Sequence, residues 1–269
     1  MAARAAPSTD ALQTHTAHSA PQAKRGAGRR QTRGTRRLKK GANSGQLDLC
    51  HLDEAGFALT LPPCYRWSPV GLRLSVSYQA PRGRRLNVIG GYISHGPAAG
   101  DFAYALYAGV PKSKSKQQRK SPAEVAAAYG LCENEIGAID STRLLAFLWQ
   151  LAGRPVVHAA DWKRARPLWI VLDNYSVHKC QAVKEAQAAL EAADVGLFYL
   201  PAYSSELSDI EPIWQSIKHH EMPTRSYSEL KDLKDAVETA LVQKAQNLKA
   251  AHAKTTNLLC KAAYWVAPH

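Results

Sequence analysis

The chain has 269 residues, 45% of them hydrophobic and 21% charged, which is enough for one large or two modest domains with a real core. No apolar run approaches the ~18 residues of a membrane span, and the opening stretch MAARAAPSTDALQTH lacks the apolar core of a signal peptide, so we expect a cytoplasmic protein without a membrane partner. The formal net charge of +13 favours a polyanionic partner. The five cysteines form no CxxC pair, which predicts reduced, mostly buried thiols rather than a zinc site or a disulfide framework.

The N-terminal 45 residues differ in composition from the rest of the chain. Residues 1–40 carry ten Lys or Arg residues against Asp10 alone, and large apolar residues are scarce. Such a segment buries too little apolar surface to offset its ordering entropy, so we predict a disordered basic tail over residues 1–45. The stretch KRGAGRRQTRGTRRLKK is equally compatible with a phosphate-binding arm, a solvated tail, or sequence outside the evolved domain.

Order is expected to begin with a series of strands. Strand-like runs occupy residues 47–61, 73–79, 85–95 and 102–110. A basic loop follows over residues 111–120. Ser121 and Pro122 then predict a helix start, with an N-cap followed by proline at the first helical position.

The second half of the chain alternates helices and strands. Helical patterns cover residues 141–153, 178–196, 210–220 and 227–251. The nearly continuous apolar runs at 167–174 and 197–201 are typical of buried strands. Several strands followed by this alternation predict a mixed α/β layer fold.

Three acidic residues stand out by their positions. Asp53 lies within the first predicted strand, Asp173 ends the run WIVLD, and Glu211 opens a helix. Strand ends and helix starts form the edge of an open α/β sheet where ligands bind. Carboxylates suit Mg²⁺, and three of them from separate elements can hold two ions about 4 Å apart for in-line attack on a phosphodiester.

Each acid also has a structural alternative. Ser208 and Glu211 fit a capping box, Asp173 followed by Asn174 fits a strand-ending turn, and Asp53 with Glu54 fits a solvated pair. A phosphatase of the haloacid dehalogenase type is set aside, because its second aspartate would fall where this chain has Tyr175.

Three stretches resemble the catalytic domain of DDE transposases, in the bacterial insertion-sequence branch of the mariner superfamily. They are LDEAGF (52–57), VLDNYSVHK (171–179) and FYLPAYSSELSDIEPIWQSIKHHEM (198–222), in the family's order. The resemblance covers roughly residues 46–250 and implies a ribonuclease-H-like mixed sheet flanked by helices. It divides the chain into a tail at 1–45, the catalytic domain at 46–250 and a C-terminal tail at 251–269.

The resemblance implies metal-dependent DNA cleavage and strand transfer. Asp53 would bridge two Mg²⁺ ions, Asp173 would bind one and Glu211 the other, with Mn²⁺ able to substitute. The expected partners are double-stranded DNA, as transposon ends and target, and a second copy of the chain in an active homodimer. The resemblance also places the protein in the bacterial cytoplasm, associated with the nucleoid.

Further residues receive secondary roles. Asn174 and His178 match the family's DNxxxH block, and His178 either contacts DNA or supports the Asp173 loop by hydrogen bonding. His219 and His220 are expected to pack or to face solvent. The basic loop is either a phosphate contact or a plain solvated loop; its candidates are Lys112, Lys114, Lys116, Arg119 and Lys120.

Two departures from the family bear on activity. The family's Ser-Pro-Glu-Leu-Asn is Ser204-Ser205-Glu206-Leu207-Ser208 here, and no helix-turn-helix pattern precedes Asp53. We therefore expect a truncated or frameshifted catalytic portion. The alternatives are a catalytically incompetent, nucleic-acid-binding relic and a general ribonuclease-H-like nuclease.

Overall fold

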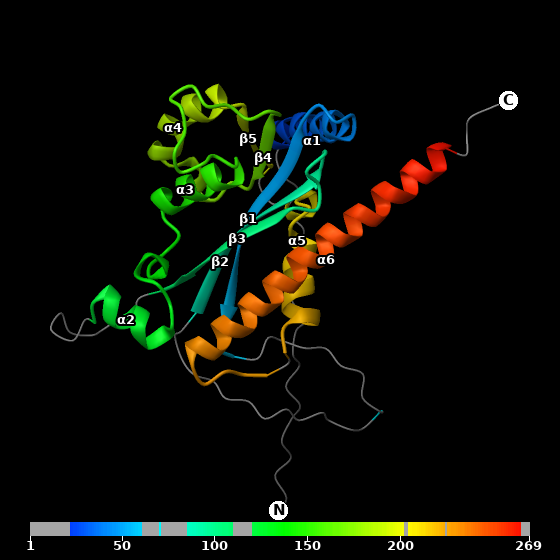
Figure 1. Ribbon diagram of the computed structural model, residues 1–269. Helices are drawn as coiled ribbons and strands as arrows, with labels where there is room; N and C mark the ends of the chain where they lie inside the picture. The colour runs from blue at the N-terminus through cyan, green and yellow to red at the C-terminus, as the bar shows by residue number, and fades with distance from the viewer. Residues whose placement is uncertain are drawn as a thin grey trace, which may run out of the picture.

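A mixed β-sheet forms the centre of the molecule (Figure 1). The computed structural model describes residues 22–60, 70, 85–109, 120–201, 204–223 and 225–264; the side chains of 22–32, 205 and 256–264 lie outside the description. Within these residues, five strands are hydrogen-bonded in the order β3-β2-β1-β4-β5. They are β1 (Asp48–Ala58), β2 (Arg85–His95), β3 (Phe102–Ala108), β4 (Leu168–Leu172) and β5 (Val195–Tyr199).

Strand direction divides the sheet into two parts. β1, β2 and β3 are antiparallel neighbours, whereas β4 runs parallel to both β1 and β5. The strands predicted at 47–61, 85–95, 102–110, 167–174 and 197–201 are confirmed, and the strand predicted at 73–79 lies outside the described residues. β4 lies between β1 and β5 and is almost wholly buried, as its continuous apolar run indicated.

Helices cover both faces of the sheet. They are α1 (Gln22–Asn43), α2 (Pro122–Tyr129), α3 (Ser141–Leu151), α4 (Gln181–Ala192), α5 (Glu211–Ser216) and α6 (Leu230–Tyr264). α2 begins as the sequence predicted, because Ser121 and Glu124 form a reciprocal capping box. A π-helical turn, Ile217–Glu221, continues α5.

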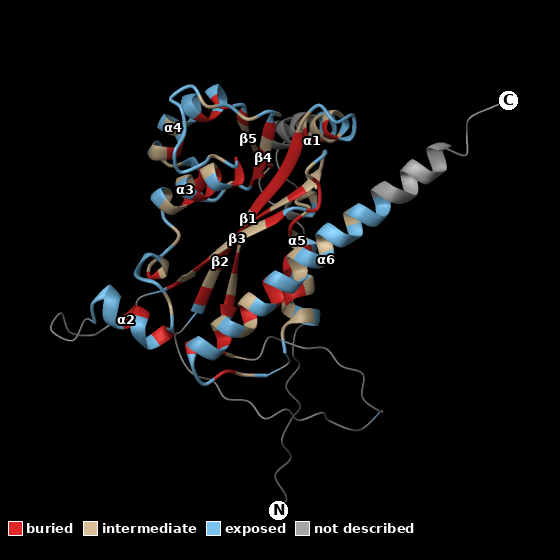
Figure 2. Cartoon of the chain, in the orientation of Figure 1, coloured by how far each residue is buried: buried red, intermediate tan, exposed pale blue. Residues whose placement is uncertain are grey.

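Alternate side chains along β1 and β4 point to opposite faces of the sheet, and a core forms on each face. Buried residues gather on β1, β4 and the helix faces that cover the sheet (Figure 2). On one face, Leu52 and Ile170 pack with Leu148 of α3 and Leu190 of α4. On the other face, the side chains of β1–β3 pack against α5 and α6, with Trp214 at the contact. The odd-numbered positions of β1 therefore face α5, and this is the face that carries Asp53.

The prediction of disorder over residues 1–45 is wrong for Gln22–Asn43, which forms α1. Ala42 is buried against Leu49, Val171 and Leu200, so the end of the segment does bury apolar surface. Gly34 lies so close to the Phe198 ring that an added Cβ would come within 2.7 Å of it. Composition missed this helix because its apolar residues are few, although Leu38 and Ala42 pack with Leu49 and Val171 of the sheet. Residues 1–21 lie outside the described residues.

The C-terminal helix is longer than predicted. α6 continues past residue 250 to Tyr264, through the expected start of the C-terminal tail, so the domain division stays a prediction. Among the described residues, no helix, α6 included, combines the length and the apolar character needed to cross a bilayer.

Candidate active site

Two of the three predicted acids lie side by side on the sheet. His51 of β1 is the register partner of Val171 of β4 in the parallel pair. Asp53 and Asp173 each follow two residues later, so both side chains leave the same face at matching heights. Parallel neighbours lie about 4.8 Å apart, which brings the two carboxylates to one place. The solvated-pair alternative for Asp53 is wrong, since Asp53 and Glu54 are partly buried within β1.

The third acid opens the helix on that face. α5 starts at Glu211, and its buried Ile213 and Trp214 anchor it to the sheet. Trp214 packs over Gly90, the register partner of Asp53, where an added Cβ would lie 2.6 Å from the indole ring. The missing side chain at Gly90 thus lets α5 approach β1. The capping-box alternative is not found, because the N-cap is Ile210 and no side chain caps the helix.

The three acids surround one cavity. A hollow of about 470 Å³ is lined by Asp53, Asp173 and Glu211 together with Asn174, Tyr175 and the apolar wall of Leu52, Leu200 and Pro201. Within the described part of the chain, no three His, Cys, Asp or Glu side chains converge closely enough to enclose one ion by themselves. Mg²⁺ usually takes only one or two protein carboxylates and completes its shell with water and phosphate oxygens, so this open arrangement fits it.

The electrostatics of Asp53 favour a cation. Burial above all, together with the charges of Glu211, Glu54 and Asp173, raises the pKa of Asp53 to about 7, although a backbone hydrogen bond opposes the shift in part. A carboxylate in such a place is repelled by its neighbours and poorly hydrated. A divalent cation would relieve both penalties, and the all-oxygen donor set suits a hard ion such as Mg²⁺ or Mn²⁺.

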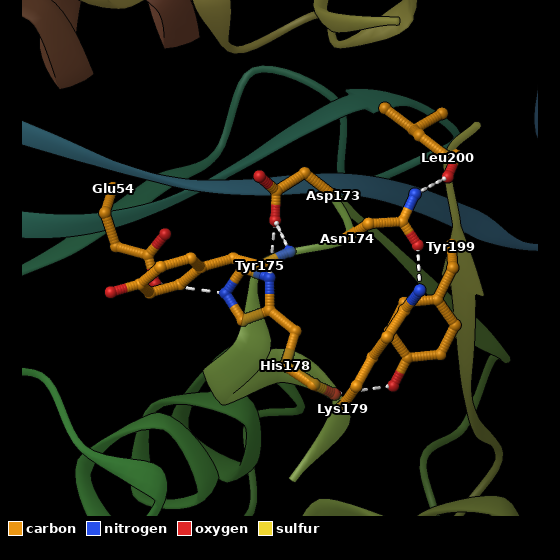
Figure 3. Close-up of polar contacts among 8 residues, drawn as sticks. All are labelled: Glu54, Asp173, Asn174, Tyr175, His178, Lys179, Tyr199 and Leu200. Atoms are coloured by element: carbon orange, nitrogen blue, oxygen red, sulfur yellow. Dashed lines mark hydrogen bonds and ion pairs between the residues drawn. The ribbon is translucent and has the colours of Figure 1, made fainter. Parts of the chain in front are cut away.

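His178 holds Asp173 in place (Figure 3). Its fully buried ring lies between two carboxylates, with Nδ1 2.8 Å from Asp173 Oδ1 and Nε2 3.0 Å from Glu54 Oε1. Burial alone would lower the pKa of His178, but the hydrogen bonds and charges of Glu54 and Asp173 outweigh it and raise the pKa. The backbone N–H of Tyr175 also donates to Asp173 Oδ1 at 2.8 Å, as in the predicted turn. Both bonds use Oδ1, and Asp173 also lines the cavity.

Asn174 fastens the same loop to the next strand (Figure 3). Its Nδ2 donates to the Leu200 carbonyl at 2.5 Å, and Lys179 donates to its side-chain oxygen. The Tyr199 hydroxyl donates to the His178 carbonyl at 2.8 Å. Asn174 and His178, the two residues of the DNxxxH block, therefore support the loop that carries Asp173. Asn174 lines the cavity, whereas His178 is buried beside Asp173.

A polar cluster beside Glu211 was missed by sequence reasoning. Asp209 Oδ1 lies 2.8 Å from Lys39 Nζ of α1, and Oδ2 lies 3.2 Å from Nε2 of the buried His51. Burial by itself would raise the pKa of Asp209, but the hydrogen bonds and charges of His51 and Lys39 lower it well below its usual range. His51 and Asp209 each precede a site acid by two residues, so the cluster fixes the entry to α5 against β1. Their separation of 158 residues left no signal in the sequence.

The predicted DNA-binding loop is mostly outside the described residues. Only Lys120 of that group is described, and it is exposed; Lys112, Lys114, Lys116 and Arg119 are not. His219 and His220 face solvent, as expected. The structure brings two other cations toward the acids. Lys218 lies near Asp53 and Glu211, and Arg85 lies over Gly56 on β1.

Residues 115–234 match the family model described as DDE superfamily endonuclease. The match contains Asp173 and Glu211, whereas Asp53 precedes it. Comparison with curated proteins gives no match.

Two solved structures of Mos1 share the fold. The chain is similar to the Mos1 transposase paired-end complex with left transposon end, at 13% identity, a TM-score of 0.51 and 90% coverage of this chain. It is also similar to the mariner Mos1 paired-end complex with Mg, at 11% identity, a TM-score of 0.50 and 91% coverage. The chain spans 64% of the length of each of these Mos1 chains. At such identities the likeness establishes the fold, a ribonuclease-H-like mixed sheet with flanking helices, and this confirms the predicted fold class.

Proposed function

We propose that this protein is a DDE-type DNA endonuclease that performs the strand cleavage and strand transfer of a transposase. The observation that carries the proposal is the meeting of Asp53, Asp173 and Glu211, from three separate elements, at one cavity. The DDE superfamily endonuclease match over residues 115–234 supports the same chemistry for the two acids that it contains. The proposed triad is the one that the sequence predicted.

Asp53, Asp173 and Glu211 would hold two Mg²⁺ ions, with Mn²⁺ able to substitute. Bound ions of this kind polarise a phosphodiester and lower the pKa of an attacking water. The chain's own residues do the rest. Asp53 must release its proton before it can bind a cation. His178 fixes the orientation of the Asp173 carboxylate through its contact with Oδ1. Trp214 packs α5, the helix that begins at Glu211, against the sheet.

We propose double-stranded DNA, as transposon ends and target, for the substrate. The Mos1 structure of similar fold is a paired-end complex with a transposon end, and the net charge of +13 suits a phosphate backbone. A homodimer in the active complex, membership of the bacterial insertion-sequence branch and a nucleoid-associated cytoplasmic location belong to the same proposal.

A nicking assay tests this function. Purified protein is incubated with supercoiled plasmid carrying the inverted repeats that flank the gene, in Mg²⁺, Mn²⁺ or EDTA. We expect metal-dependent nicking that falls at least about 100-fold in Asp173→Asn and Glu211→Gln, since even outer-shell partners of a metal cost 10- to 100-fold. Asp235→Asn and Glu185→Gln are matched controls, because both side chains are exposed on helices away from the cavity.

Two outcomes would contradict the proposal. Nicking that survives in Asp173→Asn and Glu211→Gln would place the chemistry elsewhere. Absence of nicking by the wild-type chain, with salt-sensitive DNA binding retained, would instead support a catalytically incompetent, DNA-binding relic.

A further inference from the structure

A second cavity, of opposite charge, lies next to the acidic one. It has a volume of about 310 Å³ and contains Lys218, His219 and Arg225 in its lining, with no carboxylate. Its apolar wall includes Phe57, Met222 and Leu233. Positive charge beside an apolar wall is the chemistry that binds a nucleotide, whose phosphate is anionic and whose sugar and base present apolar faces.

Residues on one face of β1 line both cavities. Asp53 lines the acidic cavity and Phe57 lines the basic one, and both occupy odd-numbered positions, which face α5. The charges of Asp53 and Glu211 act on Lys218, which places this cation of the basic cavity close to the acids. The basic cavity therefore lies beside the acidic one on the same face of the sheet.

A buried hydroxyl in the basic cavity lacks a partner. Tyr227 is only 4% exposed and lines the cavity, yet its hydroxyl has no hydrogen-bond partner among the described residues. Buried polar groups are nearly always hydrogen-bonded, because burial without a partner forfeits the hydrogen bond that water would provide. A ligand that donates or accepts a hydrogen bond in the cavity would supply the missing partner.

An aromatic ring lies beside each of the two cations. Arg225 Cζ lies 4.9 Å from the Tyr227 ring centroid, and Lys218 Nζ lies 5.6 Å from that of Phe57. Burial and the nearby Arg85 lower the pKa of Lys218, and the charges of Glu211 and Asp53 oppose this only in part. An anion bound between these cations would stabilise their charged forms.

We propose that the basic cavity binds one nucleotide of the DNA strand whose neighbouring phosphodiester enters the acidic cavity. Lys218 and Arg225 contact its phosphate, the Tyr227 hydroxyl completes its hydrogen bonding, and Phe57 and Met222 face its apolar part. The inference rests on the proposed function, because it takes DNA as the substrate. It adds a substrate-binding site in residues that neither the predicted basic loop nor the acidic triad contains.

The test is DNA binding without metal. A fluorescein-labelled duplex of the flanking repeat is titrated with the full chain in EDTA at several NaCl concentrations. Lys218→Met and Arg225→Gln are each expected to weaken binding about 3- to 10-fold and to reduce the slope of log K against log salt by about 1. Tyr227→Phe is expected to weaken binding about 2- to 5-fold with the slope unchanged, because it removes a hydrogen bond and no charge.

Control variants distinguish the loss of a specific DNA contact from the loss of one positive charge anywhere on the surface. Lys184→Met removes an exposed lysine on α4, on the opposite face of the sheet, and is expected to bind as the wild type does. Lys218→Arg keeps the charge and should retain most of the affinity. The inference is overturned if Lys218→Met loses no more affinity than Lys184→Met, or if Tyr227→Phe binds as the wild type does. Circular dichroism and thermal unfolding establish that each variant is folded.

The two proposals fail separately. A chain that binds DNA through Lys218 and Tyr227 but does not nick it contradicts the endonuclease function alone. A chain that nicks DNA in Mg²⁺ while its Lys218, Arg225 and Tyr227 variants bind like the wild type contradicts the nucleotide site alone.

Discussion

At the scale of single residues, Asp53 carries the greatest electrostatic penalty of the site. It is partly buried, and the charges of Glu211, Glu54 and Asp173 act on it together, so its pKa rises to about 7. An unfolded aspartate releases its proton near pH 3.8. Between these two values the folded chain binds one more proton at Asp53 than the unfolded chain does, and raising the pH therefore favours unfolding.

This penalty predicts a pH-dependent gain of stability in Asp53→Asn. In EDTA at pH 8, the variant should be more stable than the wild type by on the order of 1–3 kcal/mol, after allowance for partial exposure, because it removes an ionised carboxylate from the cluster. At pH 4 the difference should nearly vanish, since folded Asp53 is then neutral. Urea unfolding at both pH values measures it, with Asp235→Asn as the control. A difference equal at pH 4 and pH 8 would contradict the assigned pKa.

At the scale of elements, the site depends on how closely α5 approaches the sheet. Gly90 and Gly91 are neighbours on β2 whose missing side chains face opposite sides. An added Cβ at Gly90 would lie 2.6 Å from Trp214 of α5, whereas one at Gly91 would lie 2.5 Å from a terminal methyl of Leu151 on α3. The first contact bears on the helix that presents Glu211, and the second bears on the opposite core.

Comparing Gly90→Ala with Gly91→Ala should therefore separate a loss of stability from a change in site geometry. Each variant adds a methyl group to a filled space and should lose about 1–3 kcal/mol of unfolding free energy. Only Gly90→Ala should also reduce nicking, by about tenfold or more per folded molecule, because displacement of Trp214 moves Glu211 away from Asp53. Urea unfolding and the nicking assay are compared for the two variants. Equal activity in both would show that α5 accommodates the methyl group without moving Glu211.

At the scale of the whole molecule, the three acids belong to three separate elements of the fold. Asp53 lies in β1, Asp173 follows β4, and Glu211 begins α5, which packs with α6 on one face of the sheet. Cations shared among these acids would link the elements in the folded state alone, since the unfolded chain holds the acids far apart. Binding to the folded state alone stabilises it by mass action.

Divalent metal should accordingly raise the thermal unfolding temperature. At a Mn²⁺ or Mg²⁺ concentration about 100 times the dissociation constant, the gain is about 2.7 kcal/mol. For a chain of this size that corresponds to roughly 5–10 °C. Glu211→Gln should lose most of the shift, while Glu185→Gln keeps it, with NaCl matching the ionic strength throughout. An equal shift in the wild type and Glu211→Gln would mean that the ion binds elsewhere.

The sequence alone predicted the strands that the structure describes, several helix starts and the acids that line the cavity. The apolar run at residues 167–174 predicted a buried strand, and Ser121 predicted a helix start. The structure has β4 and the capped start of α2 at these places. The core face of α5 was likewise readable, since Ile210, Ile213, Trp214 and Ile217 recur at helical spacing and all are buried. Composition did not predict α1, because the few apolar residues of this helix are anchored by apolar residues that the sheet supplies.

Only the tertiary structure decided what surrounds the acids. The register of β1 with β4 sets Asp53 beside Asp173, and the packing of Trp214 over Gly90 brings Glu211 to them. Likewise, Lys218 and Tyr227 became candidates only when β1, the π-helical turn and the segment before α6 were seen to share a cavity. The physical reason is that charge interactions, burial and hydrogen bonding depend on distances in space between residues far apart in the chain, whereas periodicity records only the neighbours of each residue.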